Sequence, residues 1–160
     1  MRRVSTALIA LAVVLFAVPV AAGAAGTSRS VTFHLVEKQV ASNFVDNPPR
    51  QGPRAAPLMG DEFVFTSDLA TKSGQHAGLV SATCMIATGG IHASGPCYGV
   101  FSFKGGQLMA MAKVAFSSNT TEIVVVGGTG VYRGATGYIV SVSRGENSPY
   151  SDDTFHLQLP

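Results

Sequence analysis

The chain has 160 residues, which is the usual length of one domain. It carries 11 basic and 9 acidic residues, and two of the basic ones, Arg2 and Arg3, lie ahead of an apolar run at the N-terminus. The rest of the chain therefore has nine charges of each sign and no basic stripe. Because a domain that binds nucleic acid needs a basic excess, the composition argues against nucleic acid as a partner.

The first 26 residues are typical of a secretory signal peptide. Arg2 and Arg3 precede an uncharged apolar run over residues 4–20, and small residues follow around Ala22 and Ala24. The run is about the minimum length of a membrane span, but the small residues after it favour cleavage over anchoring. Its short, Ala-, Gly- and Val-rich form is typical of bacteria. We predict a secreted bacterial protein with one domain over 27–160 and no membrane association after cleavage.

The mature part predicts an all-β protein. Short runs rich in Val, Ile, Phe and Tyr recur between Gly, Pro, Asn and Ser, and no apolar pattern of helical period is sustained. Eight such runs joined by short turns favour a closed, eight-stranded antiparallel up-and-down barrel, which leaves no exposed edge. Such a barrel either fills its interior with side chains or holds one small ligand. The predicted strands cover residues 31–40, 62–69, 77–87, 97–103, 107–116, 122–126, 131–143 and 154–159.

The two cysteines, Cys84 and Cys97, predict one disulfide. An exported chain meets oxidising conditions, in which such a pair normally forms a bond. The glycines and Pro96 between them indicate a loop between two antiparallel strands. A register that places the two cysteines opposite each other also pairs Ala82 with Gly99, and directly opposed strand residues have the short separation that a disulfide needs.

The strand predicted at 107–116 is apolar on both faces, and so is most of 122–126. An antiparallel strand that is wetted on one face should alternate apolar and polar residues more cleanly. No predicted helix is available to cover the second face. We therefore expect a homo-oligomer that packs through the outside of these strands.

The segment GGTGVYRGATGYIV, residues 127–140, raises a nucleotide-binding hypothesis. The G-x-G-x-x-G pattern counted from Gly128 requires glycine at position 133, where the chain has Arg133. The motif must also open a helix, whereas residues 131–143 are β-branched and aromatic and favour a strand. A tight turn and bulges between two barrel strands explain the glycines instead. We expect this structural role for Gly127, Gly128, Gly130, Gly134 and Gly137.

The same segment resembles the signature of the allene oxide cyclase and dirigent barrels, written GGxGIFEGxYG in the cyclases and GGTGxFRxARGY in dirigent proteins. Residues 60–69, GDEFVFTSDL, are similar to the GDxxVF opening block of the family. This resemblance covers about residues 31–159. It implies an eight-stranded barrel, commonly trimeric, with a largely apolar lumen. Family members close an unsaturated fatty-acid epoxide or direct the coupling or cyclisation of phenolic intermediates, mainly by positioning a bound reactive molecule.

The residues that carry these activities match less well than the glycines do. The Asp and Arg of lignan-directing members correspond here to Val131 and Thr136, and the Asn of the cyclase block corresponds to Ser67. The first-strand carboxylate of the cyclases aligns with Leu35 or, after a two-residue shift, with Glu37. The resemblance therefore implies the fold and leaves the activity open.

The remaining polar side chains supply candidates for a site in the lumen. A carboxylate or tyrosine there would exchange protons with a bound molecule, and the imidazoles of the first and last strands would approach each other when the barrel closes. Each imidazole lies opposite the apolar face of its strand, which favours an outer surface or an interface, and without a third ligand in the pattern we expect neither a metal nor a cofactor. The candidate catalytic residues are Glu37, Asp68 and Tyr132, and the candidate ligand-binding residues are His34, Tyr98, Arg133 and His156.

Three hypotheses about function, from different classes, follow. The leading one is a secreted barrel that binds or orients a small hydrophobic molecule in its lumen. The second is an isomerase or cyclase of the allene oxide cyclase type, which acts on an unsaturated lipid or phenolic through a lumen carboxylate or tyrosine. The third is a filled barrel that associates with other proteins outside the cell. A buried carboxylate cluster in an open lumen would favour the second hypothesis, and a lumen packed with Phe and Met the third.

Overall fold

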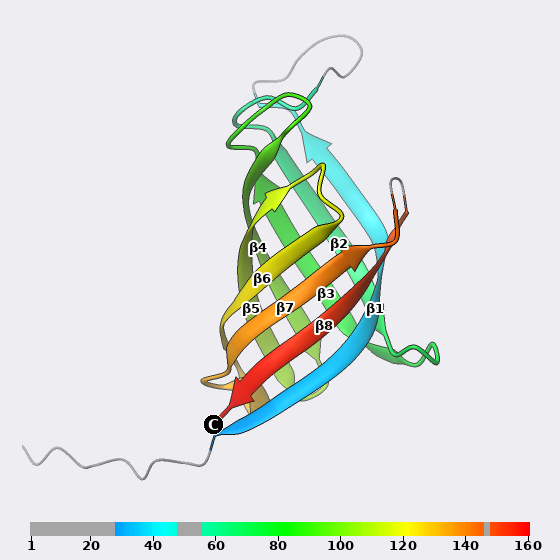
Figure 1. Ribbon diagram of the computed structural model, residues 1–160, viewed down its shortest axis with the longest axis vertical. Helices are drawn as coiled ribbons and strands as arrows, with labels where there is room; N and C mark the ends of the chain where they lie inside the picture. The colour runs from blue at the N-terminus through cyan, green and yellow to red at the C-terminus, as the bar shows by residue number, and fades with distance from the viewer. Residues whose placement is uncertain (1–27, 48–55, 146–147) are drawn as a thin grey trace, which may run out of the picture.

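The computed structural model describes residues 28–47, 56–145 and 148–160. The predicted signal peptide lies outside these residues. Eight antiparallel strands form one closed barrel, in which each strand pairs with its neighbours along the chain and β8 closes the ring against β1 (Figure 1). The predicted all-β barrel is confirmed. Its strands are β1 (Arg29–Val45), β2 (Glu62–Ala70), β3 (His76–Met85), β4 (Ser94–Phe103), β5 (Gly106–Ala115), β6 (Thr120–Gly128), β7 (Thr136–Ser143) and β8 (Tyr150–Leu159).

The predicted pairing of β3 with β4 is confirmed. Cys84 and Cys97 lie opposite each other and form a disulfide, and the same register pairs Ala82 with Gly99. The two cysteines are 13 residues apart in the sequence, so the disulfide closes a short loop. This covalent bond fixes the two strands at the end of the barrel where their connecting loop lies.

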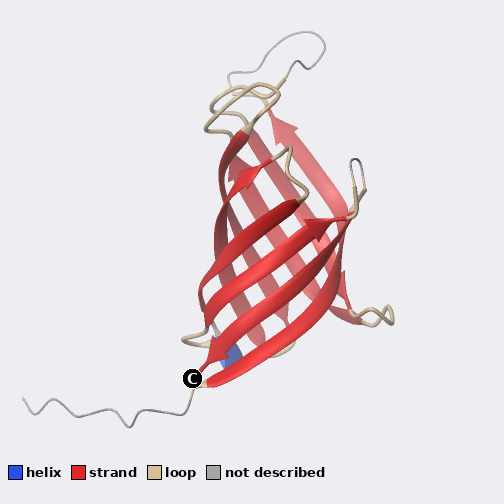
Figure 2. Cartoon of the chain, viewed as in Figure 1, coloured by secondary structure: helices blue, strands red, loops and turns tan. Residues whose placement is uncertain are grey.

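The segment predicted as one strand over 131–143 is divided in the structure. Residues Gly130–Tyr132 form a single turn of 3-10 helix, η1, and β7 begins only at Thr136 (Figure 2). The backbone amide of Val131 donates a hydrogen bond of 3.0 Å to the carbonyl of Gly105, which fastens this turn to the β4–β5 hairpin. The strand prediction was wrong over its first five residues because the chain must reverse direction between β6 and β7.

Two glycines near this reversal have backbone conformations that side chains rarely adopt. Gly130 has a φ of 59° and Gly137 a φ of 132°, and a Cβ atom at Gly137 would overlap the carbonyl oxygen of His156. Between β5 and β6 the register shifts, so that Val126 is an extra residue between the paired positions, as in a β-bulge. The glycine-rich segment therefore makes a turn, and no nucleotide-binding helix follows it.

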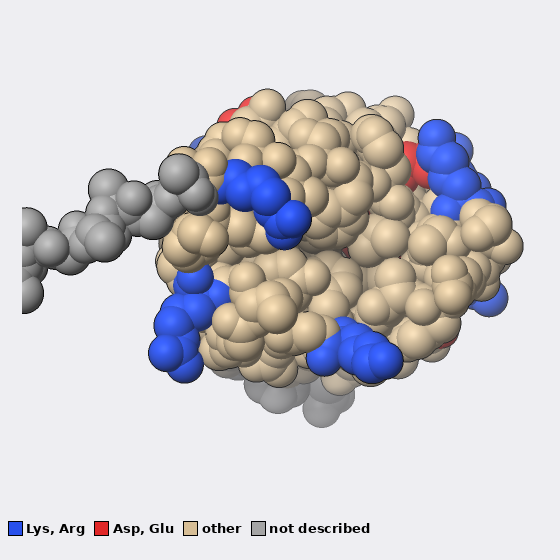
Figure 3. Space-filling view, turned by 90° about the horizontal axis from the view of Figure 1, so that it is seen from below, with Lys and Arg blue, Asp and Glu red and all other residues tan. Residues whose placement is uncertain are grey.

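Inward-facing residues alternate with outward-facing ones along every strand, and they fill one end of the barrel. We call this end, where β1 begins and β8 ends, the closed end. The ring of Phe155 stacks on Phe33 with 4.5 Å between centroids, and it meets the edges of Phe101 and Phe103 at 5.4 and 6.0 Å. Each fully buried side chain of this size contributes about 2 kcal/mol of hydrophobic free energy. Seen from outside, most of this end is uncharged, and its Lys and Arg side chains lie apart from one another near the edge (Figure 3).

The outer surface of β4, β5 and β6 is apolar and exposed. Met109 and Met111 project outward from β5, and Val124 and Val126 project outward from β6, with Met109 54% and Val126 52% exposed. We call these four residues and Tyr98 the outer apolar face. No helix covers it among the described residues, and none of the helices in that part of the chain is long and apolar enough to cross a membrane.

Candidate functional site

The lumen beyond the closed end contains a cavity of about 380 Å³, a size that suits a small organic molecule. It opens toward the loops that join β5 to β6 and β7 to β8, since Ser118 and Ser148 of those loops line it. We call this part of the barrel the open half. Its two sides differ in chemistry.

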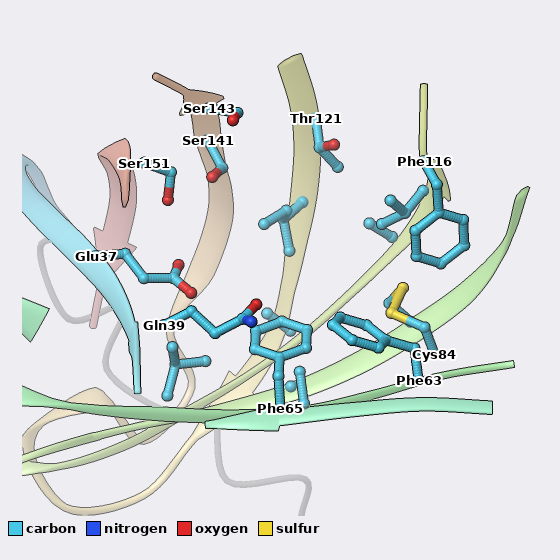
Figure 4. Close-up of a pocket in the computed structure, with 18 of the residues that line it drawn as sticks. Glu37, Gln39, Phe63, Phe65, Cys84, Phe116, Thr121, Ser141, Ser143 and Ser151 are labelled. Atoms are coloured by element: carbon cyan, nitrogen blue, oxygen red, sulfur yellow. A yellow bond between two sulfur atoms is a disulfide. The ribbon is translucent and has the colours of Figure 1, made fainter. Parts of the chain in front are cut away.

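One side of the cavity is aromatic. Phe63 and Phe65 project inward from alternate positions of β2, with 5.5 Å between ring centroids, and Phe116 meets Phe63 edge-on at 6.4 Å. The Cys84–Cys97 disulfide lies beside these rings (Figure 4). We call this side the aromatic wall. It offers ring faces and soft sulfur atoms to a bound molecule.

The other side carries hydroxyl groups. Thr121 of β6, Ser141 and Ser143 of β7 and Ser151 of β8 line the cavity there, and Figure 4 shows them across the space from Phe63 and Phe65. We call these four residues the hydroxyl wall. The hydroxyls of Ser143 and Ser151 already donate to the Gly145 carbonyl at 3.1 Å and to Asp153 Oδ1 at 3.3 Å, so they offer a ligand acceptor lone pairs. A wall of hydroxyls suits neutral oxygen or nitrogen groups.

Two carboxyl groups lie where the hydroxyl wall meets β1. Glu37 faces the cavity and is opposite Ser151 in the β1–β8 ladder, while Asp153, two residues further along β8, is opposite Leu35. Glu37 and Asp153 are thus diagonal neighbours on the inner face, a separation that side chains span. Asp153 is only 1% exposed, whereas Glu37 is half-buried.

The buried position of Asp153 controls its protonation. Burial first, and then the negative charge of Glu37, raise the pKa of Asp153 from 3.8 to about 8, although hydrogen bonds from Ser141 and Ser151 act in the opposite direction. Its Oδ1 atom accepts the Ser151 hydroxyl at 3.3 Å. At neutral pH Asp153 is therefore a neutral acid beside a carboxylate.

Two buried polar atoms in the layer of side chains next to those that line the cavity lack a partner among the described residues. The Oδ2 atom of Asp153 and the Oγ atom of Ser67 are buried and have no hydrogen-bond partner among the described residues. Ser67 projects inward from β2, between Phe65 and Leu69 in the chain. Since unpaired buried polar atoms cost free energy, a bound molecule that reaches them gains more than it would from exposed groups.

The structure separates the three candidate catalytic residues. Glu37 lies in the cavity. Asp68 lies on the outer side of β2, opposite Lys38 in the β1–β2 ladder. Tyr132 lies in η1 at the closed end, where its ring is 5.5 Å from that of Phe103 and burial raises its pKa. Only Glu37 therefore borders the open half.

The four candidate ligand-binding residues do not come together in the lumen. His34 and His156 do lie close, as closure of the barrel suggested, but on the outer face, where each bonds a threonine of the neighbouring strand. Tyr98 is among the residues that border the cavity, but it is 57% exposed and its ring belongs to the outer apolar face. Arg133 is exposed just after η1. No group of three or more His, Cys, Asp or Glu side chains that could hold a metal occurs in the described parts of the chain.

Sequence reasoning missed Asp153 because the last strand was predicted to begin at Thr154. The signal was nonetheless in the pattern: Phe155, Leu157 and Leu159 alternate, and extending that alternation back by two residues places Asp153 on the same inner face. A carboxyl group that alternates with three buried apolar residues is expected to be buried too, which is rare for an aspartate.

Comparisons with known proteins agree with the barrel. No family model and no curated protein matches the chain. Among solved structures, a pyocyanin demethylase superposes with a TM-score of 0.67 and 19% identity, covering 79% of this chain and 99% of the other. The pterocarpan synthase dirigent protein PsPTS1 superposes with a TM-score of 0.65 and 15% identity, and the match covers 82% of this chain and 94% of the other. The Diels-Alderase AbmU from Streptomyces koyangensis superposes with a TM-score of 0.58 and 20% identity, and the match covers 84% of this chain and 69% of the other.

At these identities the likeness shows the fold alone. The chain has the fold of the dirigent proteins and of the Diels-Alderase barrels, as the resemblance of its glycine-rich segment implied. The residues of the open half are its own, and the function has to be argued from them.

Proposed function

We propose that this protein is a secreted bacterial barrel that binds and orients a small hydrophobic molecule in the open half of its lumen. The observation that carries the proposal is the cavity of about 380 Å³ between the aromatic wall and the hydroxyl wall. The names of the similar structures, a demethylase, a pterocarpan synthase and a Diels-Alderase, describe proteins that handle small organic molecules and support the same conclusion.

The two walls would orient a ligand in complementary ways. Ring faces on the aromatic wall remove apolar surface from water, and each buried ring adds favourable stacking or edge contacts. Hydroxyls on the opposite wall bond polar atoms on one edge of the ligand and fix which edge faces them. Holding a reactive molecule in one conformation in this way favours one product over its alternatives without a covalent step.

A pair of variants on one strand tests this proposal. Phe65→Ala removes a ring of the aromatic wall, whereas Val64→Ala shortens the adjacent residue of β2, which points outward and is 38% exposed. We expect Phe65→Ala to weaken binding of the neutral fluorescent probe N-phenyl-1-naphthylamine about tenfold, because a full ring contact is worth about 1 to 2 kcal/mol. Val64→Ala should leave it unchanged. Failure of the probe to bind, or an equal loss in both variants, would show that the lumen is not the site.

Native mass spectrometry of the protein purified from culture medium would identify the physiological molecule. A co-purifying lipid or phenolic supports the proposal. The test is independent of the probe, since it asks what the lumen holds after export.

The acid pair favours a second candidate function, an isomerase or cyclase. Asp153 holds a proton at neutral pH and Glu37, beside it, accepts one, so the pair has the two protonation states that a proton-transfer reaction needs. Incubating the protein with the molecule recovered from its lumen, followed by chromatography and mass spectrometry, tests this. A product of unchanged mass that forms with the wild type and fails to form with Asp153→Asn, while binding persists, supports catalysis. No product with the wild type leaves the binding function as the better account.

We also propose that the protein is a homo-oligomer in which copies pack through the outer apolar face. Its five residues are too exposed and too close together for an isolated secreted domain, and Tyr98, Met111 and Val124 lie opposite one another in successive ladders across β4, β5 and β6. A repeated apolar row of this kind suits a second copy of the same surface. The family resemblance favours three subunits.

A further inference from the structure

The side chains around the cavity carry charge of one sign only. Among the described residues that line it, Glu37 is the only one with a charge at neutral pH, and no Lys, Arg or His of those residues lines it. Asp153 lies just below Glu37 and adds a second carboxyl group. The open half therefore has a negative or neutral interior.

The basic side chains near the open half lie on the outside of the barrel. Lys38, next to Glu37 in the chain, points away from the lumen, and its Nζ atom lies 5.8 Å from the ring centroid of Tyr150, a residue that lines the cavity; the Arg144 guanidinium lies 5.7 Å from the same ring. Arg144 is held by two hydrogen bonds of 2.9 and 2.7 Å to the Asp152 carboxylate. Arg50 and Arg54 lie outside the described residues. Among the described residues, the Lys38 and Arg144 cations lie over the ring of Tyr150, and no Lys, Arg or His lines the cavity itself.

An anionic ligand would lose water without gaining an opposite charge. Taking a carboxylate, sulfonate or phosphate out of water costs several kcal/mol unless a positive group replaces the water. The hydroxyl wall supplies dipoles only, and the Ser151 hydroxyl is already bonded to Asp153. The Glu37 carboxylate then repels a second negative charge in the same space.

A cationic or neutral ligand meets the opposite conditions. The negative charge of Glu37 attracts a positive group, and the faces of Phe63 and Phe65 attract it further, because the face of an aromatic ring is electron-rich. A neutral ligand loses less on leaving water than an anion does, and the Glu37 carboxylate does not repel it.

We propose that the open half selects its ligand by charge, accepting neutral or positively charged ring compounds and rejecting anions such as free fatty acids and phosphorylated compounds. This inference rests on the proposed binding function and narrows it to a substrate class. A protein that binds a free fatty acid through the fatty-acid carboxylate would need the opposite charge in its cavity.

Three dyes with one three-ring frame test the selection. Near neutral pH 9-aminoacridine is a cation, acridine is neutral and acridine-9-carboxylate is an anion, so their dissociation constants, measured by fluorescence titration, compare charge at nearly constant shape. We expect 9-aminoacridine to bind about tenfold more tightly than acridine, and acridine-9-carboxylate at least about tenfold more weakly, as one unit charge near Glu37 at an intermediate dielectric implies.

Two variants with the same change in net charge locate the effect. Glu37→Gln removes the lumen carboxylate, and Asp68→Asn removes one on the outer side of β2. Glu37→Gln should bring 9-aminoacridine to within about threefold of acridine, while Asp68→Asn leaves the ratio as in the wild type, because exposed charges are screened over about 10 Å.

The outcomes separate this inference from the proposed function. If acridine binds and is weakened by Phe65→Ala, but the anion binds as tightly as the neutral dye, charge selection is overturned and the binding function stands. If the Asp68→Asn change equals that of Glu37→Gln, the preference arises from overall charge and the inference is overturned. If none of the three dyes binds, both the inference and the proposed function fail.

Discussion

The closed end and the open half are built from the same strands, yet they do opposite things with their inward-facing residues. In β8, Phe155 and Leu157 are almost fully buried at the closed end, whereas Ser151 of the same strand lines the cavity. In β1, Phe33 stacks on Phe155, whereas Glu37 lies against open space. In β1 and β8, one end of the strand therefore packs the core, and the other end places polar side chains around the cavity.

This difference shows how a barrel keeps a hollow interior stable. A cavity forfeits the contacts that side chains would make if the space were filled. The closed end supplies those contacts in a compact set of aromatic and aliphatic residues, while the open half relies on the strand ladders and on the disulfide between β3 and β4. Function and stability are separated along the barrel axis.

The largest expected effect contrasts a ring from each region. Phe155→Ala should lower the free energy of unfolding by about 3 to 5 kcal/mol, because it opens a cavity in a region that is fully packed. Phe65→Ala, in the open half, should cost about 1 kcal/mol, since its ring already borders empty space. Urea unfolding measures both. Equal losses would show that the open half is packed as firmly as the closed end.

The disulfide provides the next largest effect. Replacing Cys84 and Cys97 together by Ala should lower the free energy of unfolding by about 3 kcal/mol, which the chain-entropy model assigns to a closed loop of this length. Adding a reductant to the wild type should produce a similar loss, and it should leave the variant unchanged. A loss below about 1 kcal/mol would mean that the ladders alone hold the open half.

The fold was predictable from sequence to a large extent because it depends on alternation and on turn chemistry. All eight predicted strands overlap their observed counterparts along most of their length, and the β3–β4 register followed from the two cysteines. The error at 131–143 has a local cause. β-Branched and aromatic residues signal a strand, but Gly130 and Gly134 have positive φ values that turn the chain before β7 begins.

The candidate site was predictable only in part. Glu37 was a candidate because the first-strand carboxylate of the similar cyclases aligns with it after a two-residue shift, and the structure places it in the cavity. His34 and His156 alternate with the apolar residues of their strands, which favours the outer face, and the structure places them close together there. Asp153 was missed at a strand end, where boundaries are least certain. The aromatic wall and the hydroxyl wall could not be predicted, because each combines residues from strands that are far apart in the sequence.

The acid pair should reveal itself through the pH dependence of stability, with a sign opposite to that of an ordinary salt-bridged aspartate. The pKa of Asp153 is raised to about 8 in the folded protein, so that state keeps a proton which the unfolded chain releases above about pH 4. Stability therefore falls as the pH rises from about 4 to about 8 and levels off above that.

Asp153→Asn tests this sign because the amide resembles the neutral acid and does not titrate. We expect the variant to match the wild type near pH 4 and to become progressively more stable than the wild type as the pH rises toward about 8. Asp68→Asn, on the outer side of β2, should show no such gain. Thermal unfolding at a series of pH values measures both. A variant that is destabilised near pH 8 would mean that Asp153 is ionised in the folded state.

The smallest expected effect on unfolding comes from the outside of the barrel, and it isolates assembly from both interior regions. Met109→Lys places a charge in the outer apolar face, where the side chain is already 54% exposed, so the free energy of unfolding of a single chain should change by less than about 0.5 kcal/mol. If copies pack through this face, the same charge must be buried at the interface without a partner, and light scattering after size exclusion should find monomers. Met59→Lys changes a loop methionine that is 73% exposed and should leave the assembly of the wild type intact. A Met109→Lys protein that keeps the wild-type mass in solution would exclude this face as the interface.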